Sequence, residues 1–302
     1  MGADSHTTTY GAFGAFSAGI GRSEVASIWA TDEIWLKVPE TIKINIEGKI
    51  PSGVYPKDII LHIIGNLGAD GVLYKAVEFS GKVVREMSIS GRMTLCNMAV
   101  EMGAKNGYVE ADEKTIQWLT PRTNKKYEIT KSDSDAKFEK IINYDISKLE
   151  PQIACPHTVD NVKPVSKVIG TKIDQALIGT CTNGRIKDLK IASEILKGKK
   201  ISDRVRLLVF PASMEIYAEA MELGILRELI RSGAVIMNPG CGPCLGAHEG
   251  VLAPGEVCLS TANRNFKGRM GCKEAEVYLA SPATVAASSL YGEITDVRGN
   301  LK

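Results

Sequence analysis

Residues 238–246 read Asn-Pro-Gly-Cys-Gly-Pro-Cys-Leu-Gly and carry two thiols, Cys241 and Cys244, in a Cys-x-x-Cys spacing. A third thiol, Cys181, lies 60 positions before Cys241 in the stretch Gly-Thr-Cys-Thr-Asn. All three follow short apolar runs of the kind that form buried strands. Because ligands in open α/β sheets collect just beyond the carboxyl ends of strands, we expect an α/β fold in which these thiols meet at one edge of a sheet.

The ligand count at these thiols bears on which metal they bind. A structural zinc site usually closes with four ligands, taken from two Cys-x-x-Cys pairs or from one pair and histidines. This chain offers one pair and one distant thiol. Three thiolates from separate strand ends suit a [4Fe-4S] cluster in which one iron has no protein ligand and can act as a Lewis acid.

Two other interpretations of the thiols remain open. All three could be inert, buried cysteines, as we expect for the other four cysteines of the chain, which are Cys96, Cys155, Cys258 and Cys272. The sequence Cys-Gly-Pro-Cys is also that of thioredoxin-like oxidoreductases, whose second cysteine lies in a long helix. Glycine and proline at 246, 250, 254 and 255 make a long helix after Cys244 unfavourable.

A candidate anion site follows another apolar run. Residues 263–269 read Asn-Arg-Asn-Phe-Lys-Gly-Arg and contain Arg264 and Arg269. Planar guanidinium groups bind carboxylates through two parallel hydrogen bonds, which a lysine cannot reproduce. Each arginine alone is compatible with a surface ion pair. Beside a Lewis-acidic iron, both are predicted to anchor a di- or tricarboxylate.

Asp4, Ser5 and His6 form a candidate site for proton transfer. Adjacent residues of an extended segment point to opposite sides, so we expect Ser5 and His6 to be poorly placed to pair with each other. A carboxylate and an imidazole suit general acid–base chemistry better. Glu101 would join them if its helix faces the same cleft, and Asn97, four residues earlier, shares that helix face.

Composition restricts the class of protein. The chain has 302 residues, of which 44% are hydrophobic and 24% charged, as in globular proteins. A formal net charge of +2 without a basic block argues against a nucleic-acid or membrane-surface role. No apolar run is long enough for a membrane span, and no signal peptide opens the chain. Seven cysteines, an odd number, indicate a reducing cytoplasm rather than a disulfide framework.

Alternating strands and helices predict mostly parallel sheets covered by helices. We expect strands at residues 36–38, 41–46, 76–79, 173–179, 205–210, 234–237, 257–261 and 277–280. Ser90 is expected to cap a helix that runs to Gly103, and residues 120–150 are expected to be irregular. The predicted domains are 1–37, a remnant of a first domain, then 38–150 and 151–302. Because the polar segment at Met1 has no strand before it, we expect an N-terminal portion to lie outside this sequence.

With these motifs in view, the chain resembles the aconitase superfamily, in its branch of isopropylmalate dehydratase and homoaconitase large subunits. The resemblance covers nearly the whole chain and rests on residues 2–7, 96–101, 179–185, 239–246 and 263–269. Thr8-Thr9 and Gly184-Arg185 differ from aconitases proper and favour this branch.

The resemblance implies a fold of αβα domains and a role for each motif. It implies that Cys181, Cys241 and Cys244 hold a [4Fe-4S] cluster, with Asn97 and Asn263 beside it. Ser5, Arg264 and Arg269 would bind a 2-hydroxy di- or tricarboxylate. Asp4, His6 and Glu101 would transfer protons while water is removed and added back.

The resemblance also implies a separate small subunit that carries the swivel domain. We therefore expect this chain alone to be inactive. The same fold also occurs in cluster-bearing proteins that bind RNA, and this rival function has little support from a nearly neutral chain.

Overall fold

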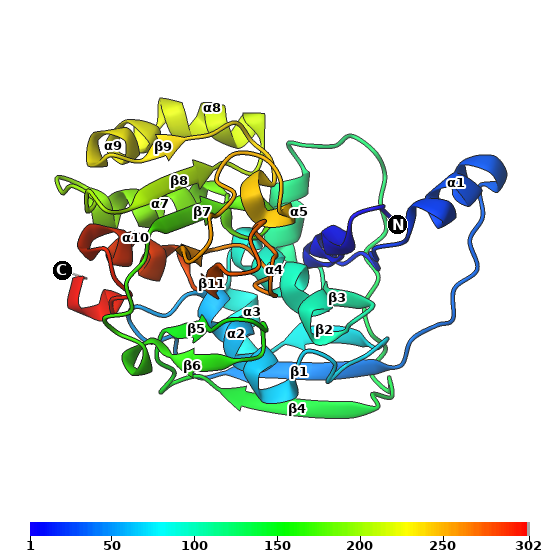
Figure 1. Ribbon diagram of the computed structural model, residues 1–302. Coiled ribbons are helices and arrows are strands. Elements are labelled where there is room, and N and C mark those ends of the chain that lie inside the picture. The colour runs from blue at the N-terminus through cyan, green and yellow to red at the C-terminus, as the bar shows by residue number, and fades with distance from the viewer. Residues whose placement is uncertain (301–302) are drawn as a thin grey trace. The chain divides into compact units, whose positions relative to one another are not determined.

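The computed structural model describes residues 1–300 and contains two compact units (Figure 1). Unit 1 comprises Met1–Ile50 and Leu67–Lys148, and unit 2 comprises Pro51–Asn66 and Leu149–Lys302. These units differ from the three predicted ranges. Residues 1–37 belong with the following sheet in unit 1, and residues 51–66 belong with the later half of the chain.

Unit 1 contains a four-stranded parallel sheet in the order β3-β2-β1-β4. The strands are β1 (Thr41–Glu47), β2 (Ala76–Ser80), β3 (Asn106–Val109) and β4 (Lys140–Asp145). Along β1, Ile42, Ile44 and Ile46 are buried, whereas the residues between them are partly exposed. This alternation is the period-2 pattern of a strand, and it confirms the strand predicted over residues 41–46.

The helices of unit 1 include two short 3-10 segments that carry site residues. The helical elements are η1 (Ser5–Phe13), α1 (Arg22–Thr31), α3 (Lys82–Glu86), α4 (Ile89–Met98), η2 (Ala99–Met102) and α5 (Glu113–Leu119). The prediction that Ser90 caps a helix was wrong, because the Ser88 side chain accepts the capping hydrogen bond from the Gly91 amide. The α-helix also stops at Met98 rather than running to Gly103, and continues as η2.

Two predicted stretches of unit 1 were also wrong. Residues 36–38 are irregular, and Val38 is 83% exposed, so two apolar residues around Lys37 do not form a strand where nothing buries them. Conversely, β4 lies inside the stretch predicted to be irregular. Its residues are exposed or half-buried at an edge of the sheet, and the sequence therefore lacks a clear apolar signal.

Unit 2 contains a seven-stranded sheet in the order β6-β5-β11-β10-β7-β8-β9. The neighbours from β11 to β9 are parallel, and β5 and β6 add an antiparallel edge. The strands are β5 (Gln152–Ala154), β6 (Val162–Pro164), β7 (Gln175–Gly179), β8 (Arg206–Phe210), β9 (Val235–Ile236), β10 (Val257–Ser260) and β11 (Glu276–Leu279). The predicted α/β class with mostly parallel sheets is confirmed.

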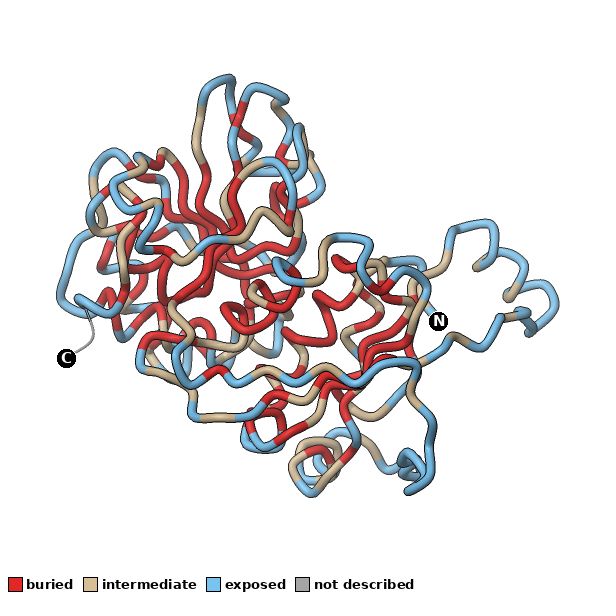
Figure 2. Tube along the Cα trace, turned by 90° about the horizontal axis from the view of Figure 1, so that it is seen from below, coloured by how far each residue is buried: buried red, intermediate tan, exposed pale blue. Residues whose placement is uncertain are grey.

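Unit 2 also contains helices and short 3-10 segments. They are α2 (Pro56–Leu67), η3 (Val165–Lys167), α6 (Thr180–Asn183), α7 (Ile186–Leu196), α8 (Met214–Glu222), α9 (Ile225–Ser232), η4 (Gly242–Leu245), α10 (Pro282–Tyr291) and η5 (Val297–Asn300). Ser213 and Ser281 cap α8 and α10 with their side chains. The N-cap of α7 is Arg185. Central strands β7, β8 and β10 are almost wholly buried. Figure 2 shows the buried segments of the chain in red.

None of the helices formed by residues 1–300 combines the length and apolarity that crossing a bilayer requires.

Candidate functional site

In unit 2 the predicted thiol and arginine motifs follow the carboxyl ends of three parallel strands. Cys181 lies in α6, directly after β7. After β9, Cys241 precedes η4 and Cys244 lies within it. Residues 263–269 follow β10. Strands β10 and β7 are neighbours in the sheet. Each of these three motifs therefore follows a strand, as the sequence predicted, and strand ends of this kind are the usual location of ligands in such sheets.

Asn263 links two of the thiols. Its Nδ2 donates a hydrogen bond to Cys181 Sγ at 3.5 Å, and Cys244 Sγ donates to its Oδ1 at 3.5 Å. The same Nδ2 also lies 3.2 Å from Thr182 Oγ1. Asn263 is only 1% exposed, so its carboxamide is held in place between the two sulfurs. Cys181 and Cys244 therefore lie at opposite ends of one amide group.

Cys241 and Cys244 belong to one tight turn. The Cys244 amide donates to the Cys241 carbonyl at 3.1 Å, and Cys241 precedes η4 as its N-cap. Residues three apart in a 3-10 helix eclipse each other, so both thiols project from one side of the turn. Cys244 is buried and Cys241 is exposed. The four-residue η4 also differs from the long helix that a thioredoxin-like dithiol requires.

These thiols form a soft donor set, which suits iron–sulfur ligation. Within residues 1–300, no group of three His, Cys, Asp or Glu side chains is already drawn together at metal-binding distance. Two of the sulfurs meet at one carboxamide, and the third lies on the same turn as Cys244. Their role as ligands of one cluster stays a prediction.

Phe210, the last residue of β8, supports both thiol loops. A Cβ atom at Gly179 would lie 2.0 Å from the Phe210 carbonyl oxygen, and one at Gly242 would lie 2.5 Å from the Phe210 ring. Both glycines have positive φ, at 137° and 52°. The chain therefore needs glycine at both positions to bring the Cys181 and Cys241 loops against the end of β8.

Arg269 lies beside the buried thiol. Its Nη2 is 3.7 Å from Cys244 Sγ, and its guanidinium is 5.3 Å from the centre of the Phe266 ring. Its buried Nε has no hydrogen-bond partner among the residues that the structure describes. A buried donor without a partner is costly, and it fits a site whose acceptor arrives with a ligand. Arg264 lies half-buried in the same segment.

Arg185 is a site residue that the sequence reasoning missed. Its Nη1 donates to the Thr182 carbonyl at 2.8 Å and its Nη2 to the Cys181 carbonyl at 2.7 Å. Burial lowers the pKa of Arg185, and neighbouring Asp188 opposes that shift. The guanidinium thus fixes the backbone of the Cys181 loop. Only the resemblance singled out this arginine, as part of residues 179–185.

In unit 1, His6 and Glu101 form a buried pair. His6 Nε2 is 2.7 Å from Glu101 Oε1, and each residue is 7% exposed. The His6 amide donates to Asp4 Oδ1 at 2.7 Å, so the Asp4 carboxylate caps η1 while remaining largely exposed. The expected approach of an imidazole and a carboxylate is present in the structure.

The expectation that Ser5 and His6 are poorly placed to pair was wrong. Ser5 Oγ lies 3.2 Å from His6 Nδ1. The prediction treated the segment as extended, but it forms the 3-10 helix η1. Neighbouring side chains of a 3-10 helix do not point to opposite sides.

Asn97 and Glu101 both reach η1, in agreement with the shared helix face. Asn97 Nδ2 donates to Thr9 Oγ1 at 2.9 Å, and Thr8 Oγ1 donates to the Asn97 carbonyl at 3.3 Å. These bonds give Asn97 a role in holding η1 within unit 1. Its predicted place beside a cluster stays a prediction.

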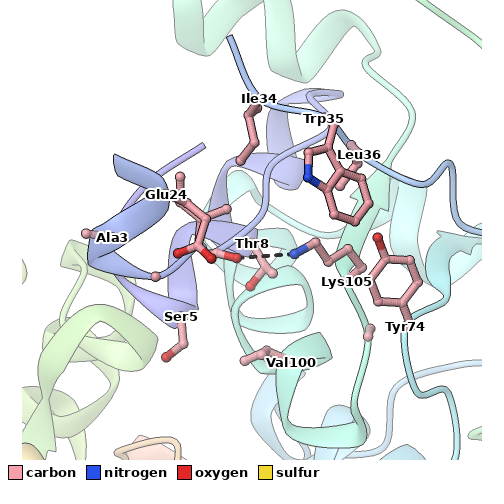
Figure 3. A pocket seen from close by; sticks show the side chains of 14 residues that line it. Ala3, Ser5, Thr8, Glu24, Ile34, Trp35, Leu36, Tyr74, Val100 and Lys105 are labelled. Atoms are coloured by element: carbon pink, nitrogen blue, oxygen red, sulfur yellow. Dashed lines mark hydrogen bonds between the residues drawn. The ribbon is translucent and has the colours of Figure 1, made fainter. Parts of the chain in front are cut away.

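A cavity of about 600 Å³ lies within unit 1 beside Ser5 (Figure 3). Trp35, Leu36 and Val100 form an apolar part of the cavity wall, and the Lys105 side chain extends into the cavity. Lys105 Nζ is 3.5 Å from the Gly19 carbonyl oxygen and 5.7 Å from the centre of the Tyr74 ring. No local sequence pattern predicts this cavity, because its lining comes from separate stretches of unit 1.

The sequence of the chain matches a known protein family. Residues 1–171 and 161–292 match the Aconitase family (aconitate hydratase). The chain belongs to the aconitase family, which confirms the predicted family and its hydro-lyase class.

Individual relatives place the chain near two kinds of large subunit. It is 56% identical over 298 residues to the probable methanogen homoaconitase large subunit of Methanosarcina mazei, covering 99% of this chain and 75% of that protein. It is 54% identical over 298 residues to the 3-isopropylmalate dehydratase large subunit 1 of Methanopyrus kandleri, covering 99% and 71%. Among solved structures, aconitase X of Thermococcus kodakaraensis matches with a TM-score of 0.42 and 14% identity, over 76% of this chain and 50% of that chain.

Proposed function

We propose that this chain is the large subunit of an iron–sulfur hydro-lyase that isomerises a 2-hydroxy di- or tricarboxylate. The substrate would be 2-isopropylmalate and 3-isopropylmalate, or homocitrate and homoisocitrate. The observation that carries the proposal is the Asn263 carboxamide between Cys181 and Cys244, with Arg269 beside Cys244. The names of the relatives support both substrate pairs equally.

The proposal assigns the cluster to unit 2. Cys181, Cys241 and Cys244 would hold a [4Fe-4S] cluster, which when bound supplies a Lewis-acidic iron for the substrate's hydroxyl and carboxylate. Asn263 and Arg269 would orient the sulfurs through hydrogen bonds, since neighbours of this kind fix the ligands of a metal site. Asn97 is proposed as a further neighbour of the cluster.

The chain's own residues would bind the substrate and move its proton. Dehydration breaks a C–O bond and the C–H bond on the adjacent carbon, and it leaves a C=C double bond and one water molecule. Rehydration adds the hydroxyl to the carbon that lost the proton, and it adds a proton to the carbon that lost the hydroxyl. Arg264, Arg269 and Ser5 would hold carboxylate and hydroxyl groups of the substrate. The pair of His6 and Glu101 would hold a proton at His6 Nε2, and Asp4, which caps η1 at the His6 amide, would take part in the same proton transfer.

The proposal includes a partner and a location. The relatives are named large subunits, which supports a separate small subunit for this chain as well. All seven cysteines are free thiols, which suits the reducing cytoplasm. No membrane and no nucleic acid is needed for the proposed reaction.

Anaerobic reconstitution with iron and sulfide tests the proposal. The chain is expected to take up a [4Fe-4S] cluster, measured by iron and sulfide content and by EPR of the reduced and oxidised protein. After addition of a small subunit, it should then dehydrate one of the two substrates. The ultraviolet absorbance of the unsaturated product would follow this reaction. Failure to bind more iron than a Cys181→Ser variant would overturn the proposal.

A further inference from the structure

Lys57 is an unexpected buried cation in unit 2. It is the second residue of α2 and is completely buried, with 0% exposure. A cation is unfavourable there for two reasons. Burial removes the hydration of the ammonium group, and the amino end of a helix repels positive charge. An apolar side chain of similar volume would avoid both costs, so the contacts of the ammonium group need to account for the lysine.

The ammonium group of Lys57 contacts the segment that carries Asn263. Its Nζ donates to the carbonyl oxygen of Thr261 at 2.8 Å and to that of Ala262 at 2.6 Å, across more than 200 positions of sequence. The Ala262 carbonyl belongs to the peptide bond that leads into Asn263. Lys57 therefore fixes the backbone from which the Asn263 side chain extends to the two thiols.

The same backbone is tied to the Cys181 loop. The Gly179 amide donates to Thr261 Oγ1 at 2.9 Å, and Thr261 Oγ1 lies 3.2 Å from the Gly179 carbonyl oxygen. Gly179 ends β7, two residues before Cys181. Lys57, Thr261 and Gly179 thus form one connected set of hydrogen bonds beneath the two loops that meet at Asn263.

We propose that Lys57 is a positioning residue for the thiol site. Its ammonium group holds the Thr261 and Ala262 carbonyls so that the Asn263 carboxamide meets the sulfurs of Cys181 and Cys244. The proposal rests on the proposed function, because that function gives these thiols the role of ligands. It goes further in assigning a task to a residue distant in sequence from every motif of the site.

Two substitutions test this role on the full chain. Lys57→Met keeps the length of the side chain and removes all donors, and Lys57→Gln keeps a neutral donor. Ile63→Ala, at a fully buried position of the same helix, is the control for general loss of packing. The first measurement is amide hydrogen exchange of the metal-free chain. Both Lys57 variants should speed exchange in peptides over residues 179–184 and 261–266 more than the control does.

The second measurement is titration with Co²⁺, whose thiolate charge-transfer absorbance reports ligation directly. The Lys57 variants should bind Co²⁺ about tenfold or more weakly than the original chain, the range that loss of a supporting residue produces. Lys57→Gln decides the question if Lys57→Met does not fold. Exchange and Co²⁺ affinity that match those of Ile63→Ala would overturn the proposal for Lys57. Absence of a thiolate band in the original chain would instead overturn the proposed function, and the exchange data would still decide the role of Lys57.

Discussion

His6 Nε2 and Glu101 Oε1 lie 2.7 Å apart, although 95 positions of sequence separate the two residues. The pair is buried, so the proton between the two groups is shielded from water. Glu101→Gln keeps the shape and removes the carboxylate. We expect hydro-lyase turnover to fall by about 10²- to 10⁴-fold, the usual contribution of a general acid–base group. Steady-state kinetics of the reconstituted enzyme with its small subunit would measure the change.

The control for this prediction is Glu86→Gln, an exposed carboxylate of the same unit. It should leave turnover unchanged. A Glu101→Gln enzyme with near-original kcat and the same cluster content would remove the pair from the proposed reaction.

The cysteines should separate into ligands and packing residues. Cys181→Ser and Cys244→Ser are expected to lose the cluster, because a serine hydroxyl at these sites cannot replace a soft thiolate. Cys96→Ser and Cys258→Ser should keep it. Burial raises the pKa of Cys96 well above its usual range and that of Cys258 to about 12, so both stay protonated and unsuited to ligation.

Iron counting and EPR after anaerobic reconstitution would measure this division. Equal iron content in all four variants would mean that the assigned thiols do not hold the metal.

The stability of unit 2 should depend on pH through the ionisation of Asp58. Burial raises the pKa of Asp58 to about 7, against the hydrogen bonds that it accepts from the Gln152 and Tyr55 amides. In the unfolded chain the pKa is about 3.9. Between these values the folded state binds the extra proton, so the contribution of Asp58 to stability falls as the pH rises from about 4 to about 7, by about 1.4 kcal/mol per pH unit.

Asp58→Asn cannot ionise and should lose this dependence. Relative to the original chain, it should gain about 2–3 kcal/mol in free energy of unfolding between pH 5 and pH 8. Urea unfolding followed by far-ultraviolet circular dichroism would measure the gain, with exposed Asp203→Asn as the control. A pH-independent difference between Asp58→Asn and the original chain would contradict the raised pKa.

Gly179 and Gly170 offer a matched pair for testing the support by Phe210. Both have positive φ, at 137° and 87°, but a Cβ at Gly170 meets nothing within 4 Å. Gly170→Ala should therefore cost only the backbone strain, about 1–2 kcal/mol. Gly179→Ala should cost about 3–5 kcal/mol, because the clash with the Phe210 carbonyl adds to that strain. Urea unfolding at one pH compares the two, and equal losses would show that the end of β8 yields easily.

Sequence patterns predicted the parallel sheets and the loops that carry the thiols, because strand periodicity and glycine-rich ends are local signals. They missed β4, whose edge position leaves its residues partly exposed. They also misjudged Ser5 and His6, because no local signal distinguished a 3-10 helix from an extended segment.

Contacts between distant segments were the harder part. Asn263 entered through the resemblance, and nothing local predicted that it would touch both Cys181 and Cys244. Lys57 reads as a surface lysine at a helix start, and only the tertiary structure buries it. The pairing of His6 with Glu101 was expected only on the condition that the helix faced the right way.

The division into two units has an optical consequence. The chain has three tryptophans, Trp29, Trp35 and Trp118, and all of them belong to unit 1. Indole fluorescence therefore follows residues 1–50 and 67–148 and is blind to unfolding of the unit that holds the thiols. Because Trp29 and Trp35 are 84% and 86% exposed, most of the emission should already be red-shifted in the native protein, and Trp118 against Phe13 is left as the informative emitter.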